Sequence, residues 1–158
     1  MKNQSLIKYI KAGKVSRVES MLTAGTSPNV KEEDWSALHW AAQSGSPRIV
    51  EMLLSFGAHV NEVDNLGITP LAVSVGVNDI EISRILIKGG AEVCKKIDAY
   101  EGGEVIHLAC SFGYENLAIL LVEEGGADLM TPDNEGKTAL DFARDAEASM
   151  ILKHYSGL

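Results

Sequence analysis

Four histidines and two cysteines are the side chains of this chain that could most readily bind a metal ion or supply a nucleophile and a base. No two histidines are spaced i and i+4, as on a metal-binding helix, and the cysteines form no Cys-x-x-Cys pair. Cys94 and Cys110 also indicate no disulfide framework, so we expect free thiols in a reducing compartment. The spacing therefore predicts no metal site. The histidines are His39, His59, His107 and His154.

Two further features resemble ligand-binding loops only in part. Residues 133–136, with the sequence Asp-Asn-Glu-Gly, begin like a calcium loop, but the remaining oxygen ligands and the closing glutamate are missing. The Gly-Gly pairs neither follow a strand nor lead into Gly-Lys-Ser/Thr, as a phosphate-binding loop would. No set of nucleophile, base and orienting residue is evident. We therefore expect no cofactor and no enzyme, and an enzyme with an unrecognised site is the remote alternative.

The composition suits one domain with a substantial core, because 46% of the 158 residues are hydrophobic. No apolar run approaches the 18 residues of a membrane span, and the N-terminal residues lack the apolar core of a signal peptide. The net charge of −8 argues against nucleic acid, which requires a basic footprint. We therefore expect no membrane and no nucleic-acid partner, and a location in the cytoplasm, or alternatively the nucleus.

Apolar anchors recur along the chain inside similar short motifs, such as Ser36-Ala-Leu-His39 and Thr69-Pro-Leu-Ala72. A glycine follows several anchors by seven residues, as at Gly45, and apolar residues at helical spacing come next. A second glycine then ends each unit, as at Gly57. The period is therefore about 33 residues. The anchors are Leu6, Leu38, Leu71, Ile106 and Leu140.

This period with a Thr-Pro-Leu-His-like opening resembles the ankyrin repeat, in which a β-turn precedes two antiparallel helices. The resemblance implies an all-α solenoid, with residues 1–158 forming a single domain of stacked helix-turn-helix units and β-turn or hairpin fingertips. The end repeats are more polar, as capping repeats must be, and the chain is either a complete protein or an excised domain. The expected repeats are residues 3–30 (N-terminal cap), 31–63, 64–96, 97–131 and 132–158 (C-terminal cap). Helices are expected near residues 4–11, 15–23, 37–44, 47–55, 70–76, 80–88, 105–112, 115–124, 138–145 and 148–155.

The resemblance implies protein recognition through the turns and the concave face beside them. The residues in these positions form an apolar and aromatic stripe with an acidic edge that also includes Glu104, which is typical of an interface. We therefore expect a monomer that acts as an adaptor or stoichiometric inhibitor and binds a partly basic, partly apolar protein segment. The predicted contacts are Glu32, Glu33, Trp35, Gln43, Ser44, Leu66, Ile68, Val77, Tyr100, Glu101, Ser111 and Phe112. In the last repeat the same register selects Asn134, Glu135, Lys137 and Arg144.

Other residues have a structural interpretation beside a functional one. The histidines of the opening motif, His39 and His107, are expected to hydrogen-bond to neighbouring turns, and Trp40 is expected in the core. Asn61 occupies the slot that asparagine hydroxylases modify in some ankyrin proteins, although bracing of the turn is the favoured interpretation. Asn29 holds the equivalent slot. The turn at residues 98–103 is one residue longer than its counterpart and is either a binding loop or a tolerated insertion.

Overall fold

The computed structural model describes residues 2–155, with side chains described from residue 5 onward. The final residues assigned to the last repeat, 156–158, lie outside this part of the chain. The helices come in five successive pairs, and a short 3-10 helix, η1, spans Asp98–Tyr100. The helices are α1 (Lys2–Lys11), α2 (Val15–Thr23), α3 (Ala37–Ser44), α4 (Pro47–Ser55), α5 (Pro70–Gly76), α6 (Ile80–Lys88), α7 (Val105–Ser111), α8 (Glu115–Glu123), α9 (Ala139–Asp145) and α10 (Ser149–Tyr155).

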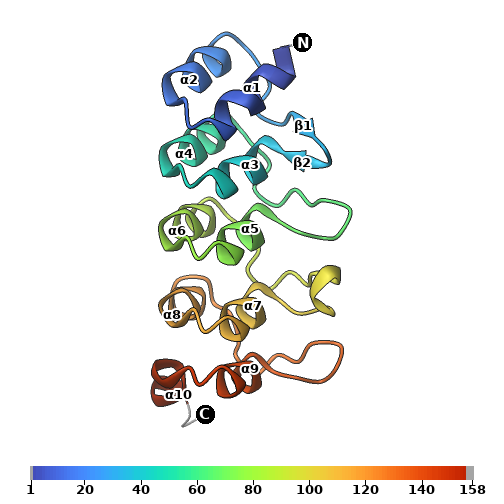
Figure 1. The fold of residues 1–158 in the computed structure, drawn as a ribbon, viewed down its shortest axis with the longest axis vertical. Coiled ribbons are helices and arrows are strands. Elements are labelled where there is room, and N and C mark those ends of the chain that lie inside the picture. The colour runs from blue at the N-terminus through green and yellow to red at the C-terminus, as the bar shows by residue number, and fades with distance from the viewer. Residues whose placement is uncertain (1, 156–158) are drawn as a thin grey trace.

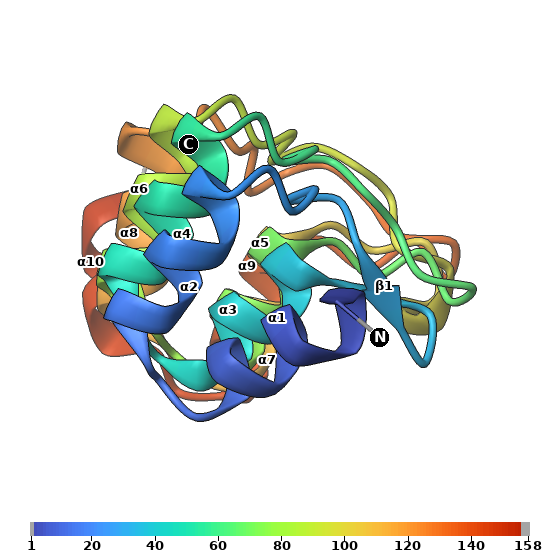
Figure 2. The same cartoon turned by 90° about the horizontal axis from the view of Figure 1, so that it is seen from above.

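The helix pairs stack in a single column, one above the next (Figure 1). Seen along the column, α1, α3, α5, α7 and α9 form one layer and the even-numbered helices form a second (Figure 2). In Figure 1 the two layers stand side by side, and the turns project from the first layer on the side away from the second. The expected all-α solenoid is confirmed, and each helix lies within about two residues of its expected bounds.

The opening motif of each repeat starts its first helix for identifiable chemical reasons. In the third repeat the hydroxyl of Thr69 caps the helix by accepting from the backbone N–H of Ala72 at 3.1 Å. Pro70 takes the first helical position, where a missing N–H costs nothing. The first helix of each of two repeats is followed closely by a residue with positive φ. This angle is 68° at Gly45, after α3, and 56° at Asn78, after α5. These positions favour glycine, or asparagine as the next best residue.

One core runs the length of the column, because each repeat packs on its neighbours. The repeating anchors are at its centre: all five are at most 4% exposed. The first helices of successive repeats, here called the inner helices, contact one another. The second helices, here called the outer helices, do the same. Within residues 2–155, no helix has both the length and the apolar character needed to cross a membrane.

Candidate protein-binding surface

The turns between repeats are narrow loops, of which one is a true hairpin. Strand β1 (Lys31–Glu32) pairs antiparallel with β2 (Trp35–Ser36), so that Glu32 faces Trp35. Glu33 at its tip has a φ of 51°, so a non-glycine residue adopts the left-handed conformation there. The turns of the last two repeats are closed by isolated bridges, Ile97 to Gly103 and Pro132 to Thr138.

Successive turns are hydrogen-bonded to one another, so they form a continuous edge of the column. The four bonds run from Trp35 Nε1 to Asp64 Oδ2 (3.0 Å), from Asn65 N to Asp34 Oδ2 (2.6 Å), from Ala99 N to Leu66 O (3.3 Å) and from Asn134 N to Glu101 O (2.9 Å). Each bond joins residues about one repeat apart, so the fold, rather than the local sequence, fixes the spacing of the turns.

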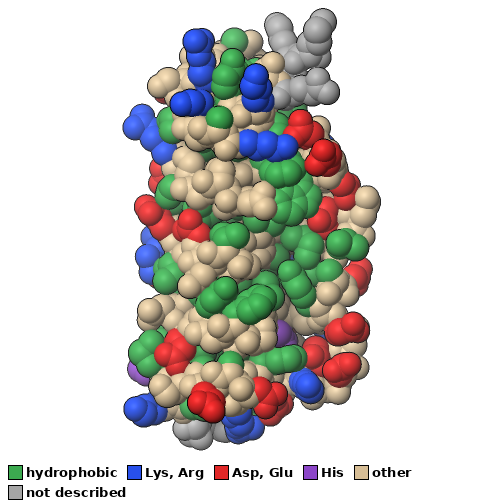
Figure 3. Space-filling view, in the orientation of Figure 1, with side chains coloured by type: hydrophobic (Ala, Val, Ile, Leu, Met, Phe, Trp, Pro, Cys, Tyr) green, Lys and Arg blue, Asp and Glu red, His purple; other side chains and the backbone are tan. Residues whose placement is uncertain are grey.

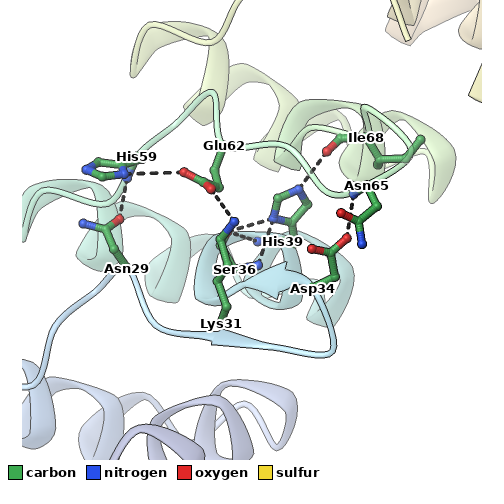
Figure 4. A network of polar contacts seen from close by, with 9 residues as sticks. All are labelled: Asn29, Lys31, Asp34, Ser36, His39, His59, Glu62, Asn65 and Ile68. Atoms are coloured by element: carbon green, nitrogen blue, oxygen red, sulfur yellow. Dashed lines mark hydrogen bonds and ion pairs between the residues drawn. The ribbon is translucent and has the colours of Figure 1, made fainter. Parts of the chain in front are cut away.

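The histidine of the opening motif supports these turns (Figure 4). His39 is fully buried, and its Nδ1 accepts from the backbone N–H of Ser36 at 3.2 Å. The proton is therefore on Nε2, which donates to the carbonyl of Ile68 in the next repeat at 3.0 Å. His107 repeats the arrangement and bonds to the carbonyl of Thr131 at 2.9 Å. Both imidazoles are thus structural links, as the resemblance implies.

The histidines of these links do not belong to a cluster of potential metal ligands among the described side chains. Across the described side chains, no three histidine, cysteine or acidic residues gather where they could hold an ion. Burial lowers the pKa of His39 from 6.5, although its bond to the carbonyl of Ile68 opposes the shift. A neutral imidazole suits a buried link because it needs no counter-charge.

We expect acid to weaken the fold through His39. Because its folded-state pKa is below 6.5, the unfolded chain binds the proton more readily. Its contribution is therefore present above the unfolded pKa and is lost as the pH falls from 6.5 through the folded pKa. Urea unfolding at about pH 7.5 and about pH 5.5 measures the change across this range. The variant His39→Gln should lose less stability between the two conditions than the wild type, and an equal loss would contradict this assignment.

Two asparagines brace the loops that connect successive repeats (Figure 4 labels the first). The Asn29 side chain donates to the carbonyl of Gly57 at 3.1 Å and accepts from the N–H of His59 at 2.8 Å. Asn61 does the same one repeat later, with the carbonyl of Gly90 at 3.1 Å and the N–H of Glu92 at 2.8 Å. Each amide therefore uses both its oxygen and its nitrogen to join two repeats.

Four of the predicted apolar contact residues are exposed: Leu66 by 60%, Val77 by 49%, Tyr100 by 39% and Phe112 by 56%. They do not form one line. Leu66 precedes α5 and Val77 follows it, so the two lie at opposite ends of this helix. We name two rows, together the binding face. The turn row is Glu32, Glu33, Trp35, Leu66, Ile68, Tyr100 and Glu101, and the helix-end row is Gln43, Ser44, Val77, Ser111 and Phe112.

Space-filling atoms show that hydrophobic side chains gather in the middle of this face, from the level of α3 to that of α7 (Figure 3). Acidic side chains follow the outer edge along the turns. The hydroxyls of Ser44 and Ser111 donate to carbonyls of their own helices at 2.9 Å. Apolar contact area at the centre with charge at the rim is the arrangement of many protein interfaces.

Three residues of the expected stripe and its acidic edge are less exposed than the sequence suggested. Trp35 and Ile68 are half-buried and pack against the core. Trp35, predicted as a contact residue, is therefore only partly accessible to a partner. Glu104, expected at the acidic edge, is only 5% exposed. It occupies the helix-capping position that Thr69 has in its own repeat, and this position faces inward.

Trp40, expected in the core, packs against it but is half-buried. Its ring lies 4.9 Å from that of Trp35, and the ammonium of Lys11 lies 3.6 Å above it. Lys11 is also ion-paired with Glu32. A cleft lined by Lys11, Trp40, Gln43 and Ser44 results, so Lys11 and Trp40 belong beside the binding face.

The sequence contained a signal for Trp40 but none for Lys11. Trp40 precedes Gln43 by three residues and Ser44 by four, a spacing that places all three on one side of a helix. Gln43 and Ser44 were already assigned to the surface, so the same reasoning extends to Trp40. Lys11 comes from the preceding repeat, and only the stacking of α1 on α3 brings it to this position.

Stacked helix pairs, projecting turns and an inward-facing capping histidine define a repeat solenoid of the ankyrin type. The family model for ankyrin repeats in three copies matches residues 6–97, and the model for ankyrin repeats in many copies matches residues 97–143. The chain belongs to the ankyrin repeat family. Ankyrin repeats generally mediate protein–protein interactions and are generally not themselves enzymatic.

Curated relatives are much longer proteins. The chain is 33% identical over 139 residues to E3 ubiquitin-protein ligase KEG of Arabidopsis thaliana, covering 87% of this chain and 8% of that protein. It is 33% identical over 121 residues to Ankyrin repeat and SOCS box protein 11 of Danio rerio, covering 75% and 39%. ARF GTPase-activating protein Git of Drosophila melanogaster is 36% identical over 85 residues, covering 52% and 12%. The chain thus spans well under half of each of these relatives.

Proposed function

We propose that this protein binds a partly basic, partly apolar segment of another protein through the binding face, as an adaptor or a stoichiometric inhibitor. The observation that carries the proposal is the exposure of four large apolar side chains on a face that also bears Glu33 and Glu101, which have no ion-pair partner among the described residues. Aromatic and aliphatic side chains in these positions would supply contact area, and the acidic edge would select a basic partner. We further propose that the protein acts as a monomer in the cytoplasm or the nucleus.

The charge of the turns supports a basic partner. Glu33 and Glu101 are exposed at the tips of two turns, and in the described part of the chain neither carboxylate has an ion-pair partner. Glu32 differs, because it is paired with Lys11. Since the whole chain carries a net charge of −8, its long-range field would also attract a cationic segment.

Affinity capture followed by chemical cross-linking identifies the partner and the residues it contacts. We expect cross-links from the partner to the binding face, and weaker capture at high salt than at low salt. Cross-links confined to the outer helices α4, α6 and α8 would contradict the proposal, and so would capture that is insensitive to salt.

We expect reversal of the charge at Glu33 to slow association roughly 2–10-fold at low ionic strength. Dissociation should change little, since charges at the rim of an interface affect encounter more than the bound state. Stopped-flow mixing with the identified partner across a salt series measures both rates. Glu51→Lys is the matched control, because Glu51 is exposed on the outer helix α4 and the change in charge is identical. An equal effect of the two variants would contradict local steering by the turn.

Hydroxylation of Asn61 is the alternative function. The two hydrogen bonds of its amide favour a bracing role instead, since the same arrangement recurs at Asn29. Peptide mass spectrometry of protein from its native source tests the alternative. A mass increase of one oxygen atom on the peptide containing Asn61 would support it, and an unmodified peptide would contradict it.

A further inference from the structure

A cleft of about 330 Å³ lies between the elongated turn at residues 98–103 and the turn of the last repeat. This volume is at the small end of the range for ligand-sized clefts. Its walls combine aromatic rings, carboxylates and one lysine. The lining residues most relevant to binding are Tyr100, Glu101, Asp133, Glu135, Lys137 and Phe142.

The wall that carries Tyr100 is held in place rather than loose. The turn is closed by the bridge between Ile97 and Gly103, and the N–H of Asn134 donates to the carbonyl of Glu101 at 2.9 Å. Gly102 has a φ of 70°, and a Cβ there would approach the Asn134 side chain to 2.5 Å. The extra residue of this turn is therefore packed against the next repeat. A preorganised wall reduces the entropy lost on binding.

The groups in the cleft favour a cation. Asp133 is buried, and its Oδ1 accepts from the backbone N–H groups of Glu135 and Lys137, each at 2.9 Å. The carboxylates of Glu101 and Glu135 are exposed and form no ion pair with any described residue. One cation is already present: the Lys137 ammonium lies 5.5 Å above the Phe142 ring. Three carboxylates and a single lysine ammonium thus line the same cleft.

We propose that this cleft receives the guanidinium group of one arginine in the partner segment. The proposal rests on the proposed function and narrows it to one side chain at one position. A guanidinium is planar and weakly hydrated, so it can stack on the exposed ring of Tyr100 while donating to Glu101 and Glu135. A lysine ammonium supplies the charge without the planar stacking surface.

Titration of the ¹⁵N-labelled protein with Nα-acetyl-arginine amide tests this assignment without a known partner. We expect saturable shifts of the backbone amides of residues 99–103 and 133–137 in the NMR spectrum. Nα-acetyl-citrulline amide is the neutral isostere and should give no saturable shift. Nα-acetyl-lysine amide should bind about threefold more weakly, because it loses much of the stacking. Equal binding of arginine and citrulline, or arginine shifts located only elsewhere, would overturn the proposal.

Two charge variants should change the affinity for arginine in opposite directions. A general loss of folding would lower the affinity in both variants, so the test does not depend on a change in fold. Glu101→Gln should weaken arginine binding about threefold or more, whereas Lys137→Gln should strengthen it about twofold because a competing cation is removed. Glu51→Gln on the outer face is the control and should have no effect. Weakening by Lys137→Gln would overturn the proposal. A protein partner that binds the binding face while arginine produces no shifts in this cleft would leave the proposed function intact and refute the arginine site.

Discussion

Replacing Leu71 with alanine is expected to lower the free energy of unfolding by about 2–5 kcal/mol, the range for large-to-small changes in a core. Leu71 is fully buried in α5, which packs against α3 on one side and α7 on the other. A cavity there would weaken two interfaces between repeats at once. The corresponding anchor Leu140 is 4% exposed in α9, and the described residues provide α9 with a neighbouring repeat on one side only. Leu140→Ala should therefore cost less.

Urea unfolding followed by circular dichroism measures both variants, and the slope of each transition shows whether unfolding stays cooperative. Phe56→Ala is a suitable control because Phe56 is 43% exposed at the end of α4. Its effect should be small beside that of Leu71→Ala. A loss at Leu140 equal to or greater than that at Leu71 would contradict the distinction between central and terminal repeats.

The fold could be predicted closely because its determinants are local and recur. A helix begins where Thr69-Pro70 supplies a cap and a fixed φ, and it ends where a residue such as Gly45 adopts positive φ. These signals act within one repeat, and similar signals recur at the same positions of other repeats, which makes the prediction secure. The anchor Leu71 and its counterparts then follow from register alone.

Exposure on the binding face was harder to predict because it depends on residues about one repeat away. Trp35 lies on a turn, where the local sequence suggests a free side chain, but its Nε1 donates to Asp64 at 3.0 Å in the next repeat. For Trp40 the difference between expected and observed exposure is reversed. Its helical position suggests burial, yet its ring faces Lys11 of the preceding repeat. Both side chains are positioned by stacking between repeats.

The burial of Glu104 was not expected from its residue type. Its charge suggested an exposed edge, although its position in the register matches the buried caps Ser36 and Thr69. Burial raises the pKa of this carboxyl, and its Oε2 has no hydrogen-bond partner among the described residues. Position in the repeat was therefore a better guide to burial than residue type.

For binding of the partner, we expect Trp35→Ala and Tyr100→Ala each to weaken affinity by about 1–3 kcal/mol, as loss of an aromatic anchor does. The two variants should differ in stability. Tyr100 is 39% exposed on a turn, so its removal should change the free energy of unfolding little. Trp35 packs against the core and contacts Trp40, and we expect its removal to cost about 1–2 kcal/mol of stability as well.

Isothermal titration calorimetry with the identified partner, beside urea unfolding of the same samples, separates these two effects. If Trp35 acted only through the fold, its variant would regain wild-type affinity at a temperature where it is fully folded. Tyr100→Ala should not destabilise the fold, so its loss of affinity should persist under every condition in which the protein is folded. The outer-face pair Arg48→Ala and Glu51→Ala should leave affinity unchanged. Normal binding by the Trp35/Tyr100 double variant, or a larger loss from the outer pair, would place the contact on another face of the solenoid.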